Sequence, residues 1–135
     1  MAAEQAALLK ADIIVWQFPF HWYSLPALMK KWLDDVFVFG FAHGDGAQLA
    51  GKKLLVSFTT GAPGEAYQRD GFFRHTVADY LPQFETTATL YQLDYQEPLY
   101  TTGIRYAGRD EAMIQAQRAA AKEHAERLVA KIQAA

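Results

Sequence analysis

The chain of 135 residues contains no cysteine, and this absence limits its chemistry. Disulfide bonds, thiol catalysis and cysteine-ligated metals are excluded, as expected for a protein of a reducing compartment such as the cytoplasm. No apolar run reaches the roughly 20 residues that a membrane-spanning helix needs. The 13 basic and 15 acidic residues nearly balance, and no basic stripe is present for nucleic acid to bind. We therefore expect a cytoplasmic protein without a membrane span or a nucleic-acid partner.

The composition describes a globular protein. Hydrophobic residues make up 51% of the chain and charged residues 21%, which suits a folded protein with one core. A chain of this length is enough for one domain and too short for two. We therefore expect residues 1–135 to form a single domain.

Hydrophobic periodicity predicts alternating helices and strands. Helices are expected over residues 2–10, 25–37, 75–91 and 110–133, and strands over 11–17, 52–60 and 92–100. Pro82 is expected to kink the third helix. In the last helix the residues expected to face inward are Met113, Ile114, Ala121, Leu128, Val129 and Ile132. This order predicts an α/β fold with a parallel sheet of about three strands and right-handed crossovers.

The most informative stretch is Ala11–Lys31, which reads as a buried strand, an aromatic turn and an amphipathic helix. The turn places four aromatic side chains around Pro19 and His21, where a connection is normally polar. Ser24 is expected to cap the following helix, and Pro26 to occupy its first turn. Such a loop after a parallel strand is where open α/β sheets bind planar ligands. A hydrophobic connection buried against a neighbouring element fits the pattern equally well.

A second candidate loop follows the strand over residues 52–60. It contains Thr59, Thr60, Gly61 and Ala62, whose hydroxyls and backbone N–H groups could hold a phosphate or the polar edge of a ligand. The loop matches neither the P-loop nor the glycine-rich dinucleotide pattern. A glycine turn after a strand is common, so this signal is weak by itself.

Other candidates are weaker. The spacing of His21, His43, His75 and His124 is not that of metal ligands, so we expect no metal site, and His124 is expected on a charged outer helix face. Ser24 and Ser57 lack the surroundings of a nucleophile. The aromatic residues Phe37, Phe39 and Phe41 could form an exposed ridge at a subunit contact or pocket, or could simply be buried.

The stretch ADIIVWQFPFHWYSLPA over residues 11–27 resembles the flavodoxin-like NAD(P)H:quinone oxidoreductase family, which includes ancillary subunits of potassium-efflux systems. The similarity continues through residues 30–37, 40–42, 49–53 and 57–62. The resemblance implies a flavodoxin-like three-layer α/β/α fold. The family begins with a strand, a phosphate-binding loop and a helix that have no counterpart here. The implied domain is therefore truncated and lacks the N-terminal βαβ portion.

The resemblance also implies a flavin site. The residues that would bind FMN or FAD are Pro19, Phe20, His21, Trp22, Tyr23, Thr59, Thr60, Gly61 and Ala62. The first five would wrap the isoalloxazine ring, and the last four would touch its polar edge. Tyr67 would face flavin and substrate as a catalytic residue, although a surface-loop tyrosine is the plain alternative. Some members of the family place a histidine near this tyrosine. The matching position here is Phe73, and His75, two residues later, is the other catalytic candidate.

The implied activity is transfer of two electrons from NAD(P)H through the flavin to a quinone-like acceptor, by a homodimer. The alternative is a non-enzymatic relative that serves as a dimerisation or regulatory module, for example of a potassium-efflux transporter. The missing phosphate loop favours the module, and the two intact loops favour the enzyme. FMN and FAD fit the motifs equally well, as do NADH and NADPH.

Overall fold

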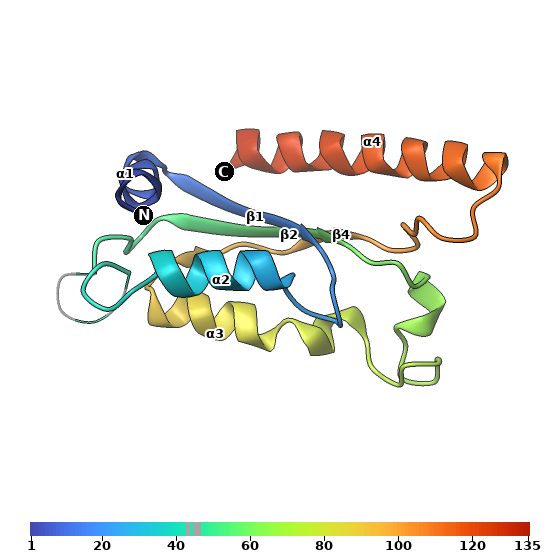
Figure 1. The fold of residues 1–135 in the computed structure, drawn as a ribbon, viewed down its shortest axis with the longest axis horizontal. Coiled ribbons are helices and arrows are strands. Elements are labelled where there is room, and N and C mark those ends of the chain that lie inside the picture. The colour runs from blue at the N-terminus through green and yellow to red at the C-terminus, as the bar shows by residue number, and fades with distance from the viewer. Residues whose placement is uncertain (43, 45–46) are drawn as a thin grey trace.

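The computed structural model describes residues 1–42, 44 and 47–135 (Figure 1). His43, Asp45 and Gly46 lie outside the described residues. The elements in chain order are α1 (Ala2–Lys10), β1 (Ile13–Pro19), α2 (Ala27–Val36), β2 (Lys53–Thr59), the 3-10 turns Gly64–Ala66 and Val77–Tyr80, α3 (Pro82–Leu90), β3 (Asp94–Tyr95), β4 (Leu99–Thr101) and α4 (Glu111–Ala134). The predicted alternation of strands and helices is confirmed.

The sheet is parallel throughout. β1 pairs with β2 over seven positions, from Ile13 opposite Lys53 to Pro19 opposite Thr59. β3 and β4 both pair with β2, so the strand expected over 92–100 is present as two short segments. The interruption falls at Pro98, because proline has no N–H to donate to the ladder. The carboxyl ends of β1 and β2 therefore lie side by side.

The layers are those of a three-layer α/β/α fold. Figure 1 shows α2 and α3 on one face of the sheet and α4 along the other. Five consecutive residues of β2 are buried, as expected for a strand covered on both faces. The expected flavodoxin-like arrangement is confirmed.

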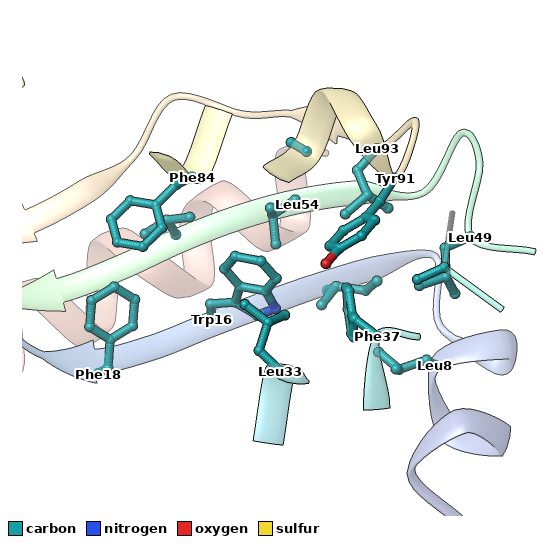
Figure 2. Packing of buried hydrophobic residues seen from close by; sticks show 14 of the residues in the cluster. Leu8, Trp16, Phe18, Leu33, Phe37, Leu49, Leu54, Phe84, Tyr91 and Leu93 are labelled. Carbon is teal, nitrogen blue, oxygen red and sulfur yellow. The ribbon is translucent and has the colours of Figure 1, made fainter. Parts of the chain in front are cut away.

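The main core lies between the sheet and helices α2 and α3 (Figure 2). Trp16 of β1 and Phe84 of α3 are almost completely buried. The ring of Phe84 lies 5.6 Å from that of Phe18, and Phe37 meets Trp16 edge-on at 5.8 Å. Aromatic pairs at these separations add stability beyond the area that they bury. This packing holds β1 rigid up to the aromatic loop that follows it.

Two predicted helix starts were wrong. Helix α2 begins at Ala27 with Pro26 as its N-cap, so Ser24 lies two residues before the cap position and makes no capping bond. Helix α3 begins at Pro82, so this proline starts a helix rather than kinking one. A first-turn proline lacks only an N–H that would have no partner within the helix. The preceding Val77–Tyr80 segment is a separate 3-10 turn.

The predicted inner face of α4 was also wrong in part. Val129 is 52% exposed and Ile132 37%, whereas His124 is 4% exposed. The N-terminus was predicted well, because Asp110 accepts a hydrogen bond from the backbone N–H of Met113 at 2.8 Å. His124 faces the sheet, where its ring contacts the hydroxyls of Ser57 and Thr101, and apolar residues of the helix face the solvent.

The aromatic ridge expected after α2 is not formed as such. Phe37 and Phe41 are buried in the core, which confirms the simpler alternative for them, and Phe39 is exposed. On α2 itself, which the sequence predicts to be amphipathic, the apolar residue Leu28 is 81% exposed. The helix therefore presents a narrower apolar stripe to the sheet than its sequence suggested.

Candidate functional site

A cavity of about 460 Å³ lies at the carboxyl edge of the sheet, within the size range of small-molecule sites. The two candidate loops meet there because β1 and β2 are in register, and the Phe20 N–H donates to the Thr59 carbonyl at 2.8 Å. The residues lining the cavity are Phe20, His21, Trp22, Tyr23, Gly61, Ala62, Tyr67, Phe73 and Tyr106. Its walls are therefore mainly aromatic.

One side of the cavity is a strained turn. His21 and Ser24 exchange two backbone hydrogen bonds of 3.0 and 3.1 Å around Trp22 and Tyr23. Trp22 has φ 49° and Tyr23 φ 66°, a left-handed conformation that normally selects asparagine or glycine. Side chains in this conformation cost about 1–2 kcal/mol each, and such strain gathers at functional sites.

The opposite side is the turn after β2. Thr60 is buried, and its hydroxyl donates to the Ala62 carbonyl at 2.9 Å. Its backbone N–H donates to Thr101, and its carbonyl accepts from the N–H of Ile104 at 2.8 Å. Thr60 is therefore committed to holding the turn in shape. Thr59 lines a separate cavity of about 220 Å³, together with Pro19.

Four backbone donors at the cavity have no protein partner. Across the described ranges 1–42, 44 and 47–135, the N–H groups of Trp22, Tyr23, Gly61 and Ala62 make no hydrogen bond. Unpaired donors beside aromatic walls suit a flat heterocycle whose edge carries carbonyl oxygens and ring nitrogens. An isoalloxazine ring has this form, so the residues present fit a flavin.

Tyr67 lies in the floor of this cavity and is 6% exposed, so the surface-loop alternative was wrong. Its ring packs 5.0 Å from that of Phe73 and 5.9 Å from that of Tyr80. Burial raises the pKa of the Tyr67 phenol, and a hydrogen bond with Thr60 partly opposes this rise. The hydroxyl therefore stays protonated at neutral pH and is able to donate.

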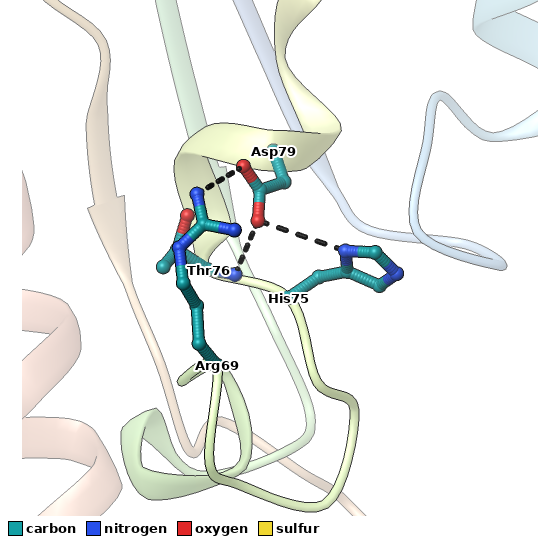
Figure 3. Close-up of polar contacts among 4 residues, drawn as sticks. All are labelled: Arg69, His75, Thr76 and Asp79. Carbon is teal, nitrogen blue, oxygen red and sulfur yellow. Dashed lines mark hydrogen bonds and ion pairs between the residues drawn. The ribbon is translucent and has the colours of Figure 1, made fainter.

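His75 lies outside the cavity lining. Its side chain is 59% exposed, and Nδ1 is 3.7 Å from Oδ2 of Asp79 (Figure 3). The same carboxylate accepts from the backbone N–H of Thr76 at 2.8 Å and from Arg69 at 3.4 Å, and the Thr76 bond is the main cause that lowers the pKa of Asp79. His75 also meets the ring of Tyr80 at 5.8 Å. His75 therefore lies outside the cavity, next to Tyr80.

Sequence reasoning missed Tyr106 as a cavity residue. It follows β4, whose carboxyl end lies at the same edge of the sheet as those of β1 and β2. The rule that ligands bind outside the carboxyl ends of parallel strands would have pointed to it. The sequence predicts a single strand over residues 92–100, so the carboxyl end of β4 at Thr101 was not recognised as a strand end that leads into the site.

A buried polar network also went unpredicted. The Nε2 atom of His124 lies 2.7 Å from the hydroxyl of Ser57, and Nδ1 lies 2.8 Å from that of Thr101. Arg127 donates to the Thr101 hydroxyl at 3.0 Å. Burial lowers the pKa of His124, and the charge of Arg127 lowers it further. Ser57 is completely buried, so this network joins α4 to the sheet and does not present a nucleophile.

The described part of the chain contains no cluster of three or more histidine or acidic side chains that could hold a metal ion. Nor does any helix in this part combine the length and apolarity needed to cross a membrane.

A parallel sheet with helices on both faces and an aromatic cavity at its carboxyl edge defines an α/β protein with a cavity where open sheets commonly place their ligand sites. The chain belongs to the family of proteins with a flavodoxin-like fold, which matches residues 1–125.

Named relatives agree with this assignment. The glutathione-regulated potassium-efflux system ancillary protein KefG of Cronobacter sakazakii is 48% identical over 97 residues, which are 71% of this chain and 53% of that protein. The chain thus spans about half the length of that relative. General stress protein 14 of Treponema denticola, solved in complex with FMN, is 35% identical with a TM-score of 0.80, over 96% of this chain and 71% of that one. The NADPH-quinone reductase of P. pentosaceus is 31% identical with a TM-score of 0.73, over 88% and 73%.

Proposed function

We propose that this protein is a flavin-dependent oxidoreductase that holds FMN in the aromatic cavity and passes two electrons from NAD(P)H to a quinone-like acceptor. The observation that carries the proposal is the set of four unpaired backbone donors on two loops facing one cavity. The similar structure that contains FMN supports FMN over FAD, and the similar NADPH-quinone reductase supports the donor and acceptor.

A bound flavin would supply the two-electron hydride chemistry, and the chain would supply binding and orientation. The N–H groups of Gly61 and Ala62 would hold the polar edge of the ring and stabilise negative charge that develops on it. Phe20, which stacks on Phe58 at 4.2 Å, would form a rigid apolar wall that excludes water. The hydroxyl of Tyr67, a residue that lines the cavity, would donate a hydrogen bond to a quinone oxygen.

His75 is assigned a supporting role. Its contact with Tyr80, which packs against Tyr67 and Tyr23, would steady the floor of the cavity. We further propose that the protein is a homodimer, that its acceptor is a quinone and that it acts in the cytoplasm. The cysteine-free composition supports that location.

The test is to add FMN to the purified protein, remove free ligand and record the visible spectrum. We expect a retained flavin spectrum and menadione reduction with NADPH. Tyr67→Phe should retain FMN and lower kcat about 10- to 100-fold, the cost of one hydrogen bond to a developing charge. Tyr100→Phe, a matched change outside the cavity, should leave kcat unchanged. A protein that retains no flavin would exclude the proposal.

A second candidate is a regulatory module of a potassium-efflux system, supported by the similarity to KefG. In this case the protein would bind its transporter whether or not menadione is reduced. Co-purification with a membrane transporter from cells, unaffected by Tyr67→Phe, is the outcome expected of this candidate.

A further inference from the structure

We propose that Tyr106 determines which acceptors the cavity admits, by stacking on flat aromatic carbonyl compounds of quinone size. This inference rests on the proposed function and names a residue that selects the substrate class. Tyr106 lies in the loop after β4, on the rim of the cavity, and comes from a different element than either candidate loop.

The loop that carries Tyr106 is tied to the turn after β2. The N–H of Gly103 donates to the Ala62 carbonyl at 2.9 Å, and the N–H of Ile104 donates to the Thr60 carbonyl at 2.8 Å. Gly103 has φ 75°, a left-handed conformation that glycine adopts without the steric cost that a side chain would bring. These bonds fix the start of the loop beside the turn after β2, and Tyr106 lines the same cavity as Gly61 and Ala62.

The rings of the cavity divide into two kinds. The floor rings Phe20 and Tyr67 are packed on other rings of the protein, at 4.2 Å from Phe58 and 5.0 Å from Phe73. The rim rings are exposed, with Trp22 at 90% and Tyr106 at 87%. Neither rim ring contacts another aromatic ring of the described residues.

Two large rings left in water on the rim of one cavity indicate a ligand surface. An aromatic ring buries about 150–250 Å² when it is covered, and stacking on a flat ligand recovers this area with favourable geometry. Aliphatic acceptors would gain much less from such a rim. The structure thus favours a flat ring as the second ligand of the site, with the Tyr106 ring rather than its hydroxyl as the selecting group.

The experiment compares Tyr106→Ala and Tyr106→Phe with the wild-type chain and a control, Phe72→Ala. Phe72 is 87% exposed, as Tyr106 is, and lies outside the cavity lining. Each protein is titrated separately with menadione and with FMN, and tryptophan emission is followed. Of the three tryptophans, Trp22 lines the cavity and Trp16 and Trp32 do not, so a Trp22→Phe variant identifies the signal that comes from the cavity.

We expect Tyr106→Ala to weaken menadione binding about fivefold or more, the cost of losing one stacked ring. Tyr106→Phe should bind nearly as well as the wild type, and Phe72→Ala should be unchanged. Equal menadione affinity in Tyr106→Ala and wild type would overturn the inference. A general folding defect is checked by circular dichroism of each variant, and binding lost equally in Phe72→Ala would also count against a specific role.

The two proposals fail separately. If FMN binds and Tyr106→Ala has no effect on menadione, the flavin function stands and the inference about Tyr106 is wrong. If FMN does not bind but menadione quenches Trp22 in a manner that depends on Tyr106, the flavin function is wrong and the inference stands.

Discussion

Trp22 and Tyr23 share a left-handed backbone conformation, but only the ring of Tyr23 makes packing contacts that offset the strain energy. The ring of Tyr23 packs against Phe73 at 5.2 Å and Tyr80 at 5.5 Å. The ring of Trp22 is 90% exposed, so burial offsets little of its strain. Strain that packing does not offset is typical of residues kept for a ligand.

Asparagine tolerates this conformation. Replacing Trp22 with asparagine should therefore stabilise the protein and weaken ligand binding. We expect Trp22→Asn to raise the free energy of unfolding by about 1 kcal/mol, the lower end of the strain cost, and to weaken FMN retention. Urea unfolding and the flavin spectrum after desalting measure the two effects. Phe72→Asn, an equally exposed aromatic without a positive φ, should not be stabilised. Equal changes in both variants would contradict the strain argument.

Helix α4 shows how a polar contact can position an element. His124 is its one buried residue, and it contacts hydroxyls on β2 and β4 through both ring nitrogens. Large apolar side chains such as Val129 remain exposed. The orientation of the helix is therefore set by hydrogen bonds, which tolerate little rotation, more than by its apolar residues.

This contact predicts a pH dependence of stability. The pKa of His124 lies below its ordinary 6.5 in the folded protein, so the unfolded chain binds more protons as the solution is acidified. The contribution of neutral His124 to the free energy of unfolding is complete above pH 6.5. It is lost as the pH falls below 6.5 toward the pKa of His124 in the folded protein. Urea unfolding at several pH values should show this loss in the wild type and not in His124→Gln. His75→Gln, which removes an exposed histidine, should keep it.

At the scale of the whole molecule, one core joins α1, α2, α3 and the sheet (Figure 2). Leu8 of α1 belongs to the same cluster as Phe84 of α3, although the two are far apart in the sequence. We therefore expect a single cooperative unfolding transition, as a one-domain chain would show.

Phe84→Ala tests this expectation. Phe84 is 1% exposed, and removal of a buried phenylalanine costs about 3–5 kcal/mol, a large part of the stability of a small domain. Thermal unfolding followed by circular dichroism should shift as a whole to lower temperature. Leu28→Ala, at an 81% exposed position, should change the midpoint little. A transition that splits into two steps would show that the core is not one unit.

Much of the fold followed from short-range pattern. The apolar runs in β1 and β2 predicted both strands, and apolar periodicity predicted a last helix close to the observed Glu111–Ala134. Patterns failed at two prolines. Pro82 starts α3 after a separate 3-10 turn, whereas the sequence reads as one helix through this point. Pro98 directly precedes β4, in a stretch that reads as one strand and forms two.

The sequence by itself determined that an aromatic loop and a threonine-glycine turn each follow a strand, because residue type and periodicity report on neighbours along the chain. Only the tertiary structure decided that Tyr67 is buried beneath the cavity, that His75 stands outside it and that Tyr106 lies on its rim. Those positions depend on the pairing of β4 with β2 and on hydrogen bonds between loops about forty residues apart. Contacts of that range leave no local pattern for the sequence to display.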